Sequence, residues 1–273
     1  MCFREIPWRA IQPGAQAVYK GKKVAVVVPA YNEERFIAGV LTTIPPFVDK
    51  IYAVNDGSVD RTLEIAQSIA KQNSHIMVIN RKERGGIGAA VTTGHKKALA
   101  DGMDVIAVMA GDGQMNPEIL DRILDPVVEG KADYSKGDRL SLSQHKKGMS
   151  AWRTFGNFLL TYLTRISSGY WHISDPQNGY TAISRGVLER VDLNKVETGF
   201  AFENDLLMKL HVCGARVGDV PHPARYRGEC SKIKYLHFMV TTSWLLLQDF
   251  LWRLWVEYIK RPFSKTSGGA KHV

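Results

Sequence analysis

The sequence predicts an α/β domain with a mostly parallel β-sheet flanked by helices. In the first half of the chain, short apolar segments typical of strands buried on both faces alternate with segments of helical period. Short polar turns join them, and such alternation favours a parallel, doubly wound sheet. The chain of 273 residues is long enough for one such domain with an appendage.

Each strand–helix unit begins with a short apolar segment and ends at turn-forming residues. The first half is expected to contain strands at 24–28, 51–54, 76–79 and 105–109, and helices at 33–43, 62–71, 89–100 and 118–129. Asn32 can cap the first helix, and Pro117 suits the first turn of the fourth. The less regular second half is expected to contain strands at 132–136, 180–183 and 217–220, and helices at 150–166, 202–211 and 235–258.

A net charge of +9 indicates an anionic partner. The basic residues do not gather with aromatic residues on one element, so no nucleic-acid partner is expected. Cys2, Cys213 and Cys230 show neither metal-ligand nor paired spacing, which favours a reducing compartment. The sequence shows no secretory signal pattern and no run of about 20 apolar residues. We therefore expect a cytoplasmic location.

Acidic residues follow two of the predicted strands. Asp56 comes directly after the second strand, and Asp112 follows the fourth, two residues before Gln114. Because the carboxyl ends of parallel strands meet at the edge where open α/β sheets bind ligands, we expect these side chains to share that edge. A carboxylate and an amide at this spacing suit a divalent cation that also holds a diphosphate. The alternative is an ordinary Asp-Gly turn.

A basic, glycine-rich segment, 84–88, follows the third strand. Its glycine spacing is not that of a dinucleotide-binding fingerprint, and the sequence contains no P-loop pattern. A nucleotide pocket at this edge would therefore be formed by carboxylates and a metal ion instead of a glycine cradle.

Eight ordered segments resemble the family-2 glycosyltransferases, which have the Rossmann-like GT-A fold. The first four are VVVPAYNEE (26–34), VNDGSVDRT (54–62), RGGIGAAVTTG (84–94) and VMAGDGQMNPE (108–118). The later four are SKGDR (135–139), SDPQNGYTAISR (174–185), FENDLLMKL (202–210) and VPHPARYRGECSK (220–232). The most similar branch is that of the dolichyl-phosphate mannose synthases and related polyprenyl-phosphate hexosyltransferases.

This resemblance implies an inverting transferase that moves a hexose from a nucleoside-diphosphate sugar to a polyprenyl (dolichyl-type) phosphate, assisted by Mg²⁺ or Mn²⁺. The positions implied for the donor are Pro29, Ala30, Tyr31, Glu33, Asp56, Gly86, Ala110, Asp112 and Arg139. The implied metal ligands are Asp112 and Gln114, and the implied catalytic residues are Asp112, Arg139, Glu203 and Asp205. The implied acceptor and diphosphate positions are Asn178, Arg225, Arg227, Ser231 and Lys232.

Three of these positions have specific implied roles. Asp56 would hold the nucleotide base, and Arg139 would pair with phosphate, for which its planar fork is suited. Ala110 departs from the family, which usually has an aspartate there, and this removes one metal or diphosphate contact. Phosphate oxygens and water can complete the coordination of Mg²⁺ or Mn²⁺, so metal dependence is still expected.

Glu203 and Asp205 lie near the start of a predicted helix. If the acceptor is a hydroxyl, one of them would take its proton during attack on the anomeric carbon. If the acceptor is a lipid phosphate, no strong base is needed, and they would position groups or contact metal. The alternative is that both simply favour a helix N-terminus.

The segment 235–258 reads as an amphipathic helix with a narrow polar stripe at Thr242, Asp249, Arg253 and Glu257. Asp249 and Arg253 have the spacing of a helical ion pair. One interpretation is an interfacial helix with Trp244, Trp252 and Trp255 at headgroup level and Lys260, Arg261 and Lys265 beside anionic lipid. The alternatives are packing on its own domain and a homodimer seam.

The sequence thus divides into an N-terminal arm (1–22), a catalytic domain (23–232), a membrane-associating or dimerising helix (233–262) and a tail (263–273). We expect peripheral attachment to the cytoplasmic face of a membrane. Two other functions remain open at this point. One is the same donor chemistry with a soluble or saccharide acceptor, and the other is a non-catalytic nucleotide-sugar-binding protein, favoured only by Ala110.

Overall fold

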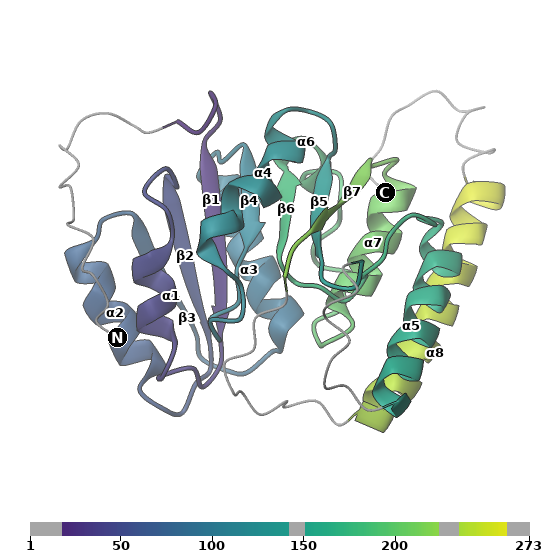
Figure 1. Ribbon diagram of the computed structural model, residues 1–273, viewed down its shortest axis with the longest axis horizontal. Coiled ribbons are helices and arrows are strands. Elements are labelled where there is room, and N and C mark those ends of the chain that lie inside the picture. Colours follow the sequence, from purple (N-terminus) through teal and green to yellow (C-terminus); the bar gives the residue numbers. More distant parts are fainter. Residues whose placement is uncertain (1–17, 142–150, 224–234, 261–273) are drawn as a thin grey trace.

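The computed structural model describes residues 18–141, 151–223 and 235–260, and these form one seven-stranded sheet in the order β3-β2-β1-β4-β6-β5-β7 (Figure 1). The strands are β1 (Val24–Ala30), β2 (Lys50–Asp56), β3 (Ile76–Arg81), β4 (Val105–Val108), β5 (Tyr134–Asp138), β6 (Thr181–Ser184) and β7 (Val217–Pro221). Strands β1 to β4 pair in parallel, and β6 is antiparallel to both β4 and β5. The predicted mostly parallel sheet is confirmed.

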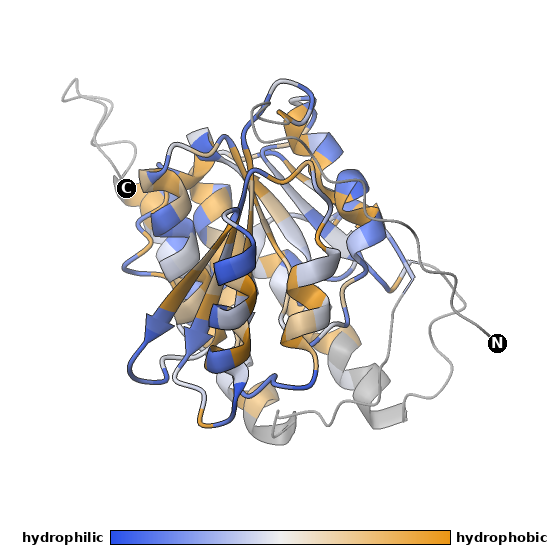
Figure 2. Ribbon diagram, turned by 90° about the vertical axis from the view of Figure 1, so that its left-hand side faces the viewer, coloured by the Kyte–Doolittle hydropathy of each residue, from blue (hydrophilic) through white to orange (hydrophobic). Residues whose placement is uncertain are grey.

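The single reversed strand determines where the loops meet. Because β6 runs against both neighbours and β7 is parallel to β5, the strands β5 and β7 run in the same direction as β1 to β4. All the strands except β6 therefore end at one edge, toward the bottom of Figure 1, and the segment leading into β6 reaches the same edge. Figure 2 shows strand arrows that are hydrophobic along their length and hydrophilic at their heads.

Helices cover both faces of the sheet. One face packs against α1 (Ile37–Thr43), α2 (Thr62–Gln72) and α4 (Leu120–Val128), and the other against α3 (Ile87–Ala100), α6 (Arg185–Leu188) and α7 (Phe202–Val212). Helices α5 (Ala151–Ser168) and α8 (Tyr235–Trp255) run side by side outside α7, and a π-helical turn, Val256–Lys260, follows α8 (Figure 1). Leu160, Met208, Met239 and Leu246 form the small core of this outer layer.

Most predicted elements are found with shifts of a few residues, and two local differences have clear causes. Asn32 does not cap α1, which begins at Ile37 instead of residue 33. Its backbone is left-handed (φ 55°), and its side chain accepts a hydrogen bond of 3.0 Å from the backbone N–H of Val59. The short helix α6 was not predicted. Pro117 does open a helical turn, capped by the side chain of Asn116.

Helix α8 is oriented opposite to what its polarity suggests. Its polar stripe faces inward: Thr242, Asp249 and Arg253 are each at most 9% exposed. Its apolar stripe faces outward and includes Trp244, which is 61% exposed. No helix within the described ranges has both the length and the apolar character to cross a bilayer.

The predicted ion pair between Asp249 and Arg253 is not formed. Arg253 donates instead to the backbone carbonyl of Ile166 on α5 (3.3 Å), and Glu257 pairs with His211 of α7 (2.9 Å). Trp252, expected at headgroup level, lies against α7, with Lys209 Nζ 5.8 Å from its ring centre. The inner face of α8 is therefore committed to its own domain.

Candidate active site

The loops after β1 and β2 are joined by side chain–backbone hydrogen bonds. The backbone N–H of Asn32 donates to Ser58 Oγ (3.0 Å), and that of Glu33 donates to Thr62 Oγ1 (2.7 Å). Tyr31 lies next to them, and the guanidinium of Arg84 lies 4.1 Å from its ring centre. Tyr31 thus borders the glycine-rich segment 84–88, and Glu33 lies beside the loop after β2. Their predicted contact with the nucleotide stays a prediction.

Asp56, at the end of β2, is buried, and its carboxylate organises that glycine-rich segment. It accepts hydrogen bonds from the backbone N–H groups of Gly85 (3.0 Å) and Gly86 (2.8 Å), and it pairs with Arg81 Nε at 3.0 Å. Gly86 has a positive φ of 96°, and a Cβ there would lie 2.5 Å from the carbonyl oxygen of Thr198, so only glycine fits. The base contact expected of Asp56 remains a prediction; the structure adds a positioning role that the sequence did not indicate.

The segment after β4 lies against the end of β1. The backbone N–H of Gly111 donates to the Pro29 carbonyl (3.0 Å), and a Cβ at Gly111 would lie 3.0 Å from the Cβ of Ala30. The partly exposed Asp112 accepts from the Gln114 backbone N–H (3.0 Å). Pro29 and Ala30 therefore lie next to the segment that carries Asp112, and the donor-binding role of these three residues stays a prediction.

The metal-ligand atoms in this segment suit a cation that is weakly held by the protein and shared with a bound diphosphate. Ala110 supplies no carboxylate, and its backbone N–H donates to the sulfur of Met115 (3.1 Å). Among the described residues, no group of three or more His, Cys, Asp or Glu side chains could hold a metal by itself. Asp112 and Gln114 supply one carboxylate and one amide oxygen, and Mg²⁺ often binds through one or two carboxylates together with substrate phosphates. The residues present fit a cation bound jointly with a diphosphate.

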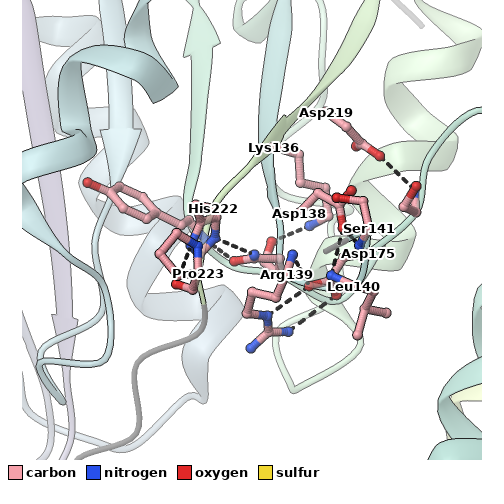
Figure 3. Close-up of polar contacts among 12 residues, drawn as sticks. Lys136, Asp138, Arg139, Leu140, Ser141, Asp175, Asp219, His222 and Pro223 are labelled. Atoms are coloured by element: carbon pink, nitrogen blue, oxygen red, sulfur yellow. Dashed lines mark hydrogen bonds and ion pairs between the residues drawn. The ribbon is translucent and has the colours of Figure 1, made fainter. Parts of the chain in front are cut away.

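Arg139, which follows β5, is held by a carboxylate from the segment before β6 (Figure 3). Its Nε and Nη2 contact the two Asp175 carboxylate oxygens at 2.7 and 3.2 Å. Asp175 is 3% exposed, whereas the Arg139 side chain is 36% exposed. Burial alone would raise the pKa of Asp175, but the Arg139 guanidinium holds that pKa below its usual value. This bidentate pair fixes the orientation of the partly exposed Arg139 guanidinium at the edge where the strands end.

The side chain of Asn178, in the same segment, is buried and makes hydrogen bonds within the domain. Its Oδ1 accepts from the Tyr180 backbone N–H (3.0 Å), so its Nδ2 is the donor toward His222 Nε2 (3.0 Å). His222 Nδ1 then carries the proton and donates to the Pro223 carbonyl (3.0 Å). Burial lowers the pKa of His222, which agrees with this neutral tautomer. Asn178, predicted at the acceptor side, thus links the segment 175–180 to His222 after β7. Figure 3 shows His222 and Pro223 beside Arg139.

The two acids at the start of α7 have separate environments. A Cβ added at Gly179 would lie 3.1 Å from Glu203 Oε1 and 3.4 Å from Met115 Cε, so Glu203 faces the strand-end loops. Burial raises the pKa of its carboxyl group, and the charge of Lys136 lessens that shift. Asp205, predicted as a catalytic residue, has its carboxylate paired inside the domain. It is 2% exposed, pairs with Lys209 one helical turn away and accepts from the Glu197 backbone N–H, so its carboxylate is committed to structure.

The remaining predicted residues, Arg225, Arg227, Ser231 and Lys232, lie outside the described residues. Three groups beside the site were missed: Arg81, Lys136 and His222. A signal for Arg81 and Lys136 existed in principle, because buried carboxylates such as Asp56 and Asp175 need nearby cations. The sequence did not show which cations would lie close.

The chain matches known glycosyltransferases in both sequence and fold. Residues 25–192 match the model of glycosyl transferase family 2. The chain is 30% identical over 181 residues to the UDP-N-acetylglucosamine–dolichyl-phosphate N-acetylglucosaminyltransferase of Methanococcus voltae, covering 62% of this chain and 72% of that one. It is 32% identical over 214 residues to the polyprenol monophosphomannose synthase of Mycolicibacterium smegmatis, covering 73% and 76%.

A solved structure of similar fold is glucosyl-3-phosphoglycerate synthase from Mycobacterium tuberculosis in complex with Mn²⁺, UDP-glucose and phosphoglyceric acid. The TM-score is 0.63 at 20% identity, over 89% of this chain and 85% of that one. At this identity the likeness concerns the fold alone, and it agrees with the GT-A arrangement of the sheet.

The sheet, its strand-end residues and these matches define a glycosyltransferase of the GT-A fold. The chain belongs to glycosyl transferase family 2, and its relatives support the branch that includes the polyprenyl-phosphate hexosyltransferases. The non-catalytic alternative suggested by Ala110 is therefore not supported.

Proposed function

We propose that this enzyme transfers a hexose from a nucleoside-diphosphate sugar to a polyprenyl phosphate, with inversion at the anomeric carbon. One observation carries the proposal: Asp112, Gln114 and the Arg139–Asp175 pair share a sheet edge, in a chain whose relatives are named for transfer to dolichyl or polyprenyl phosphates. An anionic donor and an anionic acceptor both need positive charge, and Arg139 brings it to that edge.

In this mechanism an oxygen of the acceptor phosphate bonds to the anomeric carbon while the bond from that carbon to the donor diphosphate breaks. A divalent cation, when bound by Asp112 and Gln114, would neutralise charge on the diphosphate. Arg139, oriented by Asp175, would hold phosphate oxygens as negative charge moves onto the leaving group. Glu203 would lie on the acceptor side of this edge, and the raised pKa of its carboxyl group would lessen repulsion of an anionic acceptor.

We further propose that the enzyme associates with the membrane surface through the outer face of α8. The exposed apolar residues Val240, Trp244, Leu247, Leu251, Trp255 and Tyr258 follow one another at intervals of three or four residues. We call these six residues the apolar face. Figure 1 shows α8 beginning at the end of the molecule where the strands end, so a membrane on this side would bring lipid phosphates near the site.

The test is transfer of radiolabelled hexose from a panel of nucleotide sugars. A short-chain polyprenyl phosphate and a set of soluble phosphorylated and saccharide acceptors are offered in parallel. The proposal expects label in the organic phase with polyprenyl phosphate and at most trace label with the other acceptors. Efficient labelling of a soluble acceptor alone would overturn the lipid assignment and keep the donor chemistry.

A further inference from the structure

A fully buried lysine lies beside the candidate site. Among residues 18–141, 151–223 and 235–260, Lys136 in β5 is the only lysine whose side chain is fully buried, with 0% exposure. Burying an ammonium group costs free energy unless it is paired and hydrogen-bonded. Fold stability alone therefore gives little reason for a lysine at this position.

The ammonium of Lys136 holds the backbone of the segment 175–180. Its Nζ donates a hydrogen bond to the backbone carbonyl of Asn178. Three residues earlier in this segment, Asp175 holds both nitrogens of the Arg139 fork, and the Asn178 side chain holds His222 (Figure 3). The buried ammonium group of Lys136 thus holds the middle of the segment that orients Arg139.

The charges around Lys136 come from three further elements. Asp175 lies before β6, Asp219 in β7 and Glu203 in α7, and all three favour its protonated form, while Arg139 opposes it. Burial outweighs these carboxylates and lowers the pKa of Lys136 to about 8. Asp219, which is paired in register with Lys136 across β5 and β7, has a buried Oδ1 without a hydrogen-bond partner in the described structure, so the surroundings of Lys136 are polar yet incompletely paired.

We propose that Lys136 is a positioning residue for hexose transfer: by fixing the Asn178 carbonyl it keeps Asp175 and Arg139 aligned with the reacting phosphate groups. The side chain is buried, so it acts through these neighbours and does not touch substrate. This inference rests on the proposed function.

The test replaces Lys136 by methionine, which has similar length and no charge. Lys136→Met should lower kcat for transfer about 10- to 100-fold, as loss of a supporting contact behind a functional group commonly does. Donor affinity, measured by calorimetric titration with the nucleotide sugar, should change less than about threefold, because the loops after β1 and β2 keep their contacts and Arg139 is proposed to act most strongly when charge moves onto the leaving group. Lys209→Met is the matched control: Lys209 also pairs with a buried carboxylate, Asp205, but on the side facing α8, and kcat should stay within about twofold.

The pH profile supplies a readout that mere packing would not move. The wild-type rate should fall as the pH rises past about 8, where Lys136 loses its proton, and Lys136→Met should lack this descending limb. If Lys136→Met does not fold by circular dichroism, Lys136→Gln is the second variant: its N–H donor is one bond shorter than that of lysine and uncharged, so it holds the Asn178 carbonyl less well. Lys136→Gln is expected to fold, to lose less kcat than Lys136→Met and to lack the descending limb.

The outcomes separate this inference from the proposed function. If the wild type transfers hexose and the Lys136 variants keep its kcat, or lose donor affinity as much as kcat, or lose no more than Lys209→Met, then Lys136 has no positioning role. If the wild type transfers hexose to no acceptor in the panel, the proposed function itself fails.

Discussion

At the scale of single residues, Glu203 and Asp205 show that two acids only two residues apart in the sequence can have different surroundings and different expected roles. They lie two apart at the start of α7, yet Glu203 faces the strand-end loops and Asp205 pairs with Lys209. Helical periodicity alone does not say which of two such acids turns toward a site, since both are near the helix start and both suit its dipole. The residues that pack against α7 determine which of the two acids faces the site.

Glu203→Gln and Asp205→Asn form a matched pair. With a lipid phosphate acceptor, Glu203→Gln should lower kcat by less than about tenfold, because an anionic nucleophile needs no base; a loss of about 10²-fold or more would indicate a hydroxyl acceptor. Asp205→Asn should change kcat little and lower the unfolding temperature, because Lys209 loses its partner. Transfer kinetics and thermal unfolding of both variants check this, and a large kcat loss confined to Asp205→Asn would contradict the assignment.

His95 of α3 is expected to make the fold sensitive to acid. Its ring is 1% exposed, neither ring nitrogen has a hydrogen-bond partner in the described structure, and burial lowers its pKa to about 4. The unfolded chain binds a proton near pH 6.5 and the folded chain does not, so stability falls as the pH drops from 6.5 through 4. His95→Leu should therefore be more stable than wild type at pH 5, by about 2 kcal/mol, in urea unfolding. Equal midpoints at pH 5 would contradict this.

At the scale of elements, the inner face of α8 carries a carboxyl group in an unfavourable place. Asp249 lines a cavity of about 290 Å³ with Lys209 and Trp252, and its Oδ2 has no hydrogen-bond partner in the described structure. Burial raises its pKa to about 7. The folded chain therefore keeps a proton that the unfolded chain releases near pH 4, and stability is lost as the pH rises from 4 through 7.

Asp249→Asn removes that loss. At pH 8 the variant should be more stable than wild type by about 2 kcal/mol, with little difference at pH 4, as measured by urea midpoints across this range. The stability change with pH has the opposite sign to that caused by His95, so the two effects partly cancel in the wild type. In each variant, the pH dependence caused by the remaining group should become visible. A variant that is less stable than wild type at pH 8 would show that the carboxylate makes a favourable contact there.

The apolar face of α8 yields a separate prediction about lipid. Replacing Trp244 and Leu251 together by serine should weaken sedimentation with anionic liposomes about tenfold or more, since each side chain contributes roughly 1.5–3 kcal/mol when removed from water. Met77→Ser, on the edge strand β3, changes an exposed apolar residue elsewhere and serves as the control. A shift from dimer to monomer without any change in liposome binding would assign this face to a second subunit.

How far the sequence predicts structure differs between these elements. Apolar runs that stop at polar turn residues, Tyr-Asn after β1, Asn-Asp at the end of β2 and Gly-Asp after β4, predicted these three strands and the edge they share. Such runs are typical of strands buried on both faces. The orientation of α8 was open because period gives two faces without saying which one meets the domain. Lys136 was passed over because a lysine in a strand usually points to solvent, and only the packing of β6, β7 and α7 reveals its burial.

At the scale of the whole molecule, the site is assembled from both halves of the sheet, and the cation is expected to join them. A cognate nucleotide sugar with Mn²⁺ should raise the unfolding temperature by about 5 °C at saturating concentration, and chelator or Asp112→Asn should remove most of that increase. Differential scanning fluorimetry over a donor panel measures this. Full transfer activity in excess chelator, combined with inactivity of Asp112→Asn, would refute the metal role and keep the site.

The reversed strand β6 has a consequence for how such enzymes diversify. Helix α5 and the segment that carries Asp175 and Asn178 lie between β5 and β6 in the chain, and β6 then runs opposite to β5 and β4. The loops after β1 and β2 are joined by hydrogen bonds of their own, whereas the segment after β4 is reached by this part of the chain through Tyr180, which donates to the Asn116 carbonyl (3.0 Å). We therefore expect that exchanging residues 151–180 between relatives would change the acceptor preference more than the sugar-nucleotide specificity.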